Sequence, residues 1–60
     1  MFFGRVAEIV ADSIVLTSSL GPVTLAITPE TEFPAGRPAV GDLVTAISSA
    51  FVASAIIDVG

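Results

Sequence analysis

Few side chains in this 60-residue sequence could take part in catalysis. His and Cys are absent, and the only two basic residues are arginines. A Ser or Thr nucleophile needs a neighbouring base, and only a carboxylate could act as one here. The hydroxyl pairs Ser18-Ser19 and Ser48-Ser49 lie in segments typical of turns. We therefore expect a protein that is not an enzyme and binds no cofactor.

The carboxylates offer a second possible chemistry, the binding of a hard cation. Glu30 and Glu32 are two residues apart, and Asp42 could approach them across the fold. Ca²⁺ takes six or more oxygen ligands, and no Asp-rich or Asn-rich loop accompanies these residues. The sequence favours a solvated, proline-stiffened loop with its charges pointing outward, and no metal site.

Aromatic side chains offer a third possibility, the stacking of single-stranded nucleic acid. Phe2, Phe3 and Phe51 could form such a platform. Platforms of this kind lie beside basic grooves, whereas this chain has a formal net charge of −4. Arg5 and Arg37 are far apart and have no basic neighbours. Nucleic acid is therefore not an expected partner.

No segment has the pattern of a membrane span or a secretory signal. The uncharged run of residues 43–57 is shorter than the roughly 20 apolar residues of a spanning helix and contains several Ser and Thr. The start of the chain lacks a basic region followed by an apolar stretch. We expect no transmembrane segment and no signal peptide, and a cytoplasmic location is favoured.

Short β-rich runs separated by Gly, Pro, Asp and Ser dominate the sequence. Alternation is clearest where Val23, Leu25 and Ile27 share one face. At this size a closed barrel protects strand edges better than an open sheet. Residues 1–60 are therefore expected to form a single all-β domain, a small five-stranded OB-like barrel, closed or partly open. Its expected strands are residues 2–11, 13–18, 23–28, 43–48 and 51–59.

The longest irregular stretch runs from Pro29 to Pro38 and contains three prolines and one glycine. We expect it to form a loop or a short helical turn around Phe33. The Phe33 ring is the only aromatic group in this stretch, and we predict that it closes one end of the core. Further tight turns are expected at Asp12-Ser13 and at Ser49-Ala50.

The motifs, taken in the order of the chain, resemble those of two known protein families. Gly4-x-Val6, then Gly21-x-Val23-Thr24-Leu25-x-Ile27-Thr28-x-Glu30-Thr31-x-Phe33 and Val40-Gly41-Asp42-x-Val44, resemble the bacterial family called domain of unknown function 5666. That resemblance implies an OB-like small barrel and carries over no functional residue. The ends of the chain, including Met1-x-x-Gly4-Arg5-Val6 and Ala55-Ile56-Ile57-Asp58, are also similar to the pentameric vertex proteins of bacterial microcompartment shells.

The apolar content is high for a chain that must expose most of its residues. Hydrophobic residues make up 53% and charged residues 13%, so some apolar side chains must face solvent. Neighbouring apolar pairs lead to the same conclusion, because adjacent residues of a strand point to opposite faces. No lysine protects any strand edge. The side chains expected in an assembly interface are Phe2, Val15, Ala26, Ile47, Phe51 and Ile56.

The leading functional hypothesis is a non-catalytic structural module that assembles with copies of itself into a homo-oligomer or filament. The alternative is an OB-like binding module that docks a peptide, a protein partner or an oligosaccharide. Self-assembly predicts that Ile56→Lys and Val15→Lys break the association and leave the barrel interior intact. A binding module predicts a stable monomer with one continuous apolar patch.

Overall fold

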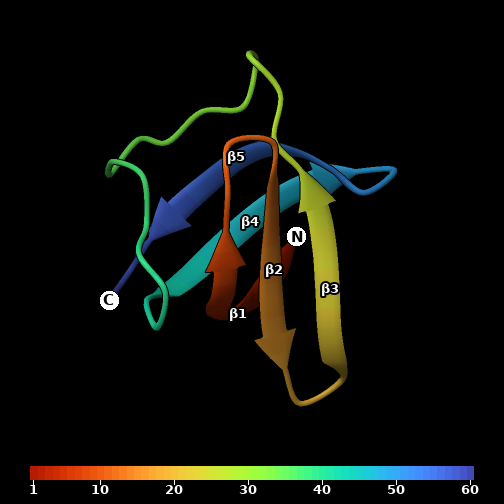
Figure 1. Ribbon diagram of the computed structural model, residues 1–60, viewed down its shortest axis with the longest axis vertical. Coiled ribbons are helices and arrows are strands. Elements are labelled where there is room, and N and C mark those ends of the chain that lie inside the picture. The colour runs from red at the N-terminus through yellow and green to blue at the C-terminus, as the bar shows by residue number, and fades with distance from the viewer.

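The computed structural model describes all residues 1–60 and shows five strands without a helix. The strands form a closed barrel in the spatial order β1-β2-β3-β5-β4 (Figure 1). This confirms the expected all-β, five-stranded barrel. The strands are β1 (Phe2–Ile9), β2 (Ser13–Ser18), β3 (Gly21–Ala26), β4 (Leu43–Ser49) and β5 (Val52–Asp58).

The weakest seam of the barrel lies between β3 and β5, which are parallel and share one bridge, Ala26 with Val52. At this bridge the Ala26 N–H donates to the Phe51 carbonyl at 2.8 Å. Farther along β5, Glu32 continues the seam through an isolated parallel bridge to Ala55. The Glu32 N–H donates to Ser54 O, and its carbonyl accepts from the Ile56 N–H, both at 2.9 Å. A loop residue therefore completes the closure of the sheet.

Thr31 fixes this loop from the inside. Its buried hydroxyl donates to the Ala53 carbonyl at 2.6 Å and accepts from the Thr28 N–H at 3.0 Å. A buried hydroxyl without such partners would be costly. Phe33 packs against the core from the same loop, as expected, and the Arg37 guanidinium lies 5.2 Å from the centre of its ring.

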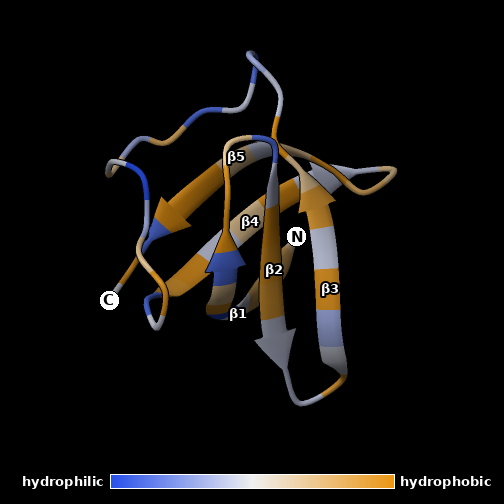
Figure 2. Cartoon of the chain, in the orientation of Figure 1, coloured by the Kyte–Doolittle hydropathy of each residue, from blue (hydrophilic) through white to orange (hydrophobic).

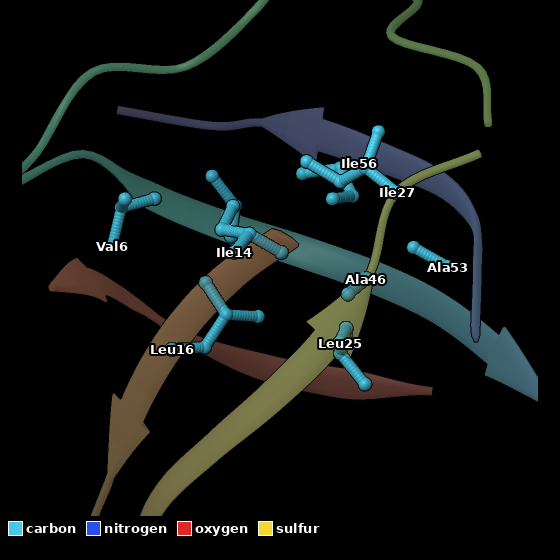
Figure 3. Packing of buried hydrophobic residues seen from close by; sticks show 9 residues of the cluster. Val6, Ile14, Leu16, Leu25, Ile27, Ala46, Ala53 and Ile56 are labelled. Carbon is cyan, nitrogen blue, oxygen red and sulfur yellow. The ribbon is translucent and has the colours of Figure 1, made fainter. Parts of the chain in front are cut away.

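The barrel interior consists of nine buried apolar side chains. Hydropathy alternates along β3, where orange and pale residues succeed one another (Figure 2), and the side chains from different strands meet in one cluster (Figure 3). Ile14 and Leu16 of β2 are fully buried. Leu25 and Ile27 are buried, as their alternation predicts, and Val23 packs on the edge of the cluster. The nine residues are Val6, Ile14, Leu16, Leu25, Ile27, Val44, Ala46, Ala53 and Ile56.

Several expected strand limits differ from the structure. The first strand ends at Ile9 rather than at residue 11, because residues 10–13 form the turn to β2, in which the Val10 N–H donates to Ser13 O. The third strand begins at Gly21 and ends at Ala26. The turn expected at Ser49-Ala50 is displaced by one residue to positions 50 and 51, since Ser49 pairs with Val52.

Gly4 is required where the backbones of β1 and β2 approach each other closely. A Cβ added at this buried glycine would lie 2.6 Å from the Thr17 carbonyl oxygen and 3.3 Å from the Phe2 ring. Backbone cannot yield as a flexible side chain can, so any larger residue would force the two strands apart. The Gly4-x-Val6 pattern therefore reflects close backbone packing.

Gly4→Ala is expected to destabilise the barrel by about 1–3 kcal/mol, the usual cost of overpacking a tight site. In a domain of this size that corresponds to roughly 4–8 °C of melting temperature for each kcal/mol. Thermal unfolding followed by circular dichroism measures the change. Ser54→Ala, at an exposed position of β5, is the control, and an equal effect of both variants would contradict the steric explanation.

Candidate interaction surface

The outer faces of the strands are the places to look for a functional site. No pocket is found in the structure, and nowhere do three Asp or Glu side chains gather as a metal site would require. Asp42 lies beside Asp58 rather than beside the Glu30 and Glu32 pair. No helix long and apolar enough to span a membrane is present.

Two of the residues expected in the assembly interface point inward. Ile56 is fully buried in the core (Figure 3), so its expected exposure is wrong, and the half-buried Ile57 faces outward instead. A bulge in the β4–β5 pairing changes the alternation so that Ala53 and Ile56, three residues apart, both point inside. Phe2 is also half-buried against the core, on the same face of β1 as Gly4 and Val6.

Val15 and Ala26 do lie on the outside, as expected, but their surroundings are polar or small. Both are half-buried on the outer face of the β2–β3 hairpin, where Val15 pairs with Thr24 and Ala26 with Ser13. We call this surface the polar face. It offers little apolar area for association with another protein. It consists of Ser13, Val15, Thr17, Pro22, Thr24 and Ala26.

Ile47 and Phe51 are exposed as expected, by 43% and 71%. Ile47 belongs to a surface that β1, β4 and β5 form together, which we call the apolar face. On it Phe3, Thr45 and Ile57 form one cross-strand row, and Ile47 with Ala55 forms the next. Figure 2 shows that apolar residues are frequent along β4 and β5. The apolar face consists of Phe3, Leu43, Thr45, Ile47, Ala55 and Ile57.

The predicted interface does not include Phe3, Leu43 or Ile57, although each has an apolar neighbour that points to the opposite face of its strand. Gly4 and Val6 indicate which face of β1 is internal, and that assignment alone would have put Phe3, exposed by 56%, on the outside. The registers that align the three strands are long-range pairings. No local pattern shows them.

Two charged residues of opposite sign border the apolar face. Arg5 lies at one corner, on the outer side of β1 opposite Leu43. Glu32 lies at the other side of the surface, beyond β5, where its bridge to Ala55 places it in the row of Ile47. The side chains of the face itself are uncharged.

The turn before β4 explains the Val40-Gly41-Asp42 motif. The Asp42 N–H donates to Ala39 O, and the Asp42 carboxylate accepts from the Ala39 N–H, both at 3.0 Å. Gly41 has φ 95°, which a side chain would disfavour. The hydrogen bond from the Ala39 N–H lowers the pKa of Asp42 below its usual value.

A lowered pKa means that the folded state favours the ionised Asp42. Its stabilisation is therefore present above the ordinary carboxyl pKa and is lost as the pH falls through the lower value of the folded protein. Asp42→Asn should lower the melting temperature at neutral pH and weaken the loss of stability on acidification. Melting curves between about pH 6 and about pH 3 measure this. Asp12→Asn is the control, and an acid response of Asp42→Asn as steep as that of the wild type would contradict the assignment.

The β4–β5 hairpin ends in a strained turn that carries the most exposed Phe. Ala50 and Phe51 form a two-residue loop with φ 52° and 63°. Both values are left-handed, as in a type I′ turn, which prefers Asn-Gly. The Phe51 carbonyl meanwhile accepts the closing hydrogen bond from Ala26. The loop thus keeps an unfavourable conformation at the barrel seam.

Phe51→Gly is expected to stabilise the monomeric barrel by about 1 kcal/mol, because glycine adopts the left-handed conformation without steric cost. The exposed ring contributes little packing that could be lost. Chemical denaturation at low protein concentration measures the gain. Phe51→Ala keeps the strain while removing the ring, so a similar gain in both variants would show that turn strain is not its source.

Comparison with protein-family models, with curated proteins and with solved structures gives no match for this chain. The resemblances to the domain of unknown function 5666 and to microcompartment vertex proteins stay predictions.

Proposed function

We propose that this protein is a non-catalytic structural module that assembles with copies of itself through the apolar face. The observation that carries the proposal is the continuity of that surface. Three hydrogen-bonded strands present mainly apolar or small side chains outward, and the charged Arg5 lies at a corner rather than among them. Contiguous apolar surfaces of this kind are typical of protein interfaces.

The small core supports the same proposal. Only 12 of 60 residues are buried in the isolated chain, and chains of this size need additional stabilisation. Association of folded copies supplies it by mass action. Cysteines that could form a disulfide are absent.

The distribution of charge also favours contact through this face. Copies with a net charge of −4 repel one another, and they come together most easily where no carboxylate intervenes. Most acidic residues lie away from the face, in the turns, the long loop and the far end of β1. Glu32 borders it on one side, and Asp58 ends β5 next to Ile57 of the face, with its half-buried side chain beside Asp42.

Light scattering on a size-exclusion column, across a concentration series, tests the proposal. A mass above 6.0 kDa that rises with concentration toward a discrete or extended assembly is expected. A monomer at all concentrations would overturn self-assembly and favour the OB-like binding module, in which the apolar face binds a different protein or peptide.

Ile47→Lys should abolish association while the barrel stays folded, because it places a charge on β4, the middle strand of the apolar face. The matched control is Thr24→Lys on the polar face, which should leave the assembly mass unchanged. Ile56→Lys is not suitable, since a lysine in the core would unfold the barrel. Equal effects of Ile47→Lys and Thr24→Lys on the mass would show that another surface associates.

A further inference from the structure

The two charged residues at the border of the apolar face define how two copies are oriented in the assembly. Building on the proposed function, we propose that two copies pack their apolar faces together about a two-fold axis, with Arg5 of each copy paired to Glu32 of the other. The occupant of the apolar face is thus a second copy of this chain, and the contact is reciprocal.

The positions of these residues follow from the strand registers. Three rows cross the face: Arg5 with Leu43, Phe3 with Thr45 and Ile57, and Ile47 with Ala55 and Glu32. Arg5 begins the first row on β1, and Glu32 ends the third row beyond β5. The positive and negative charges therefore lie at diagonally opposite corners, three strand spacings of about 4.8 Å apart across the sheet.

A two-fold rotation exchanges such corners. When one face is turned over onto the other, about an axis in the interface perpendicular to the diagonal, Arg5 of one copy meets Glu32 of its partner. The same rotation brings the first copy's Glu32 to the partner's Arg5, so both pairs form together. Isologous interfaces require self-complementarity of this kind.

Both charged groups are available for the contact. The Arg5 guanidinium donates one hydrogen bond within the chain, to Gly41 O at 2.9 Å, and its other N–H groups have no partner. The Glu32 side chain is exposed, and only its backbone takes part in hydrogen bonds. Rim charges at an interface fix orientation and exclude wrong partners more than they add affinity.

The size of the surface is compatible with a dimer. A stable interface buries about 800 Å² on each partner, roughly a quarter of the 3490 Å² that this chain exposes. An interface of that size extends beyond the apolar face to the Met1 end and Val59, which are exposed by 90% and 55%.

Charge reversal tests the pairing through the dissociation constant and the mass of the assembly. Arg5→Glu and Glu32→Arg should each weaken the association about tenfold, because like charges then meet at both corners. The double variant should return to within about threefold of the wild type. An equimolar mixture of the two single variants should associate as well as the double variant, since each then supplies the charge that the other lacks.

Arg37→Glu and Glu30→Arg are the matched controls, because they make the same changes of charge at exposed positions outside the face. Circular dichroism establishes that all variants stay folded. Wild-type association at twice the monomer mass, with rescue in the mixture, supports the proposal. Association unaffected by reversal, or not rescued, overturns the pairing and leaves the proposed function standing. A monomeric wild type overturns both.

Discussion

A closed barrel of five short strands has space inside for only one side chain of each neighbouring apolar pair. This limit determines the outer surface, because 53% of the residues are hydrophobic and the interior holds nine of them. Phe2 and Val44 point inward, so Phe3 and Leu43 must point outward. The apolar face is thus a direct consequence of filling a small core from strands that are apolar on both sides.

The fold could be predicted from the sequence because its signals are local. Strand alternation around Ile14, Leu16 and Leu25, and the turn residues between the strands, are sufficient to expect five strands and a barrel. The interface residues were predicted less well. Choosing between Ile56 and Ile57 depends on a bulge in the β4–β5 pairing, and bulges depend on the partner strand rather than on the strand's own sequence.

The left-handed turn at Ala50 and Phe51 could not be anticipated for a different reason. Its residues contradict the usual preference for Asn-Gly, so no composition rule predicts it. The two strands nevertheless fix the loop length, because Ser49 pairs with Val52 and the Phe51 carbonyl meets Ala26. Tertiary pairing overrides local preference where the barrel closes, and an aromatic side chain is left projecting into solvent.

The hydrogen bonds that close the barrel also fix the backbone at one border of the apolar face. Glu32 donates and accepts backbone hydrogen bonds with β5, and Thr31 beside it is anchored to Ala53. At the opposite corner, Arg5 is held by the carbonyl of the Gly41 turn. Two charges on exposed, mobile stems would give a contact little orientation, since ordering them costs entropy. Because hydrogen bonds fix the backbone of Glu32 and the guanidinium of Arg5, an intact barrel restricts where both corner charges lie when a reciprocal partner approaches.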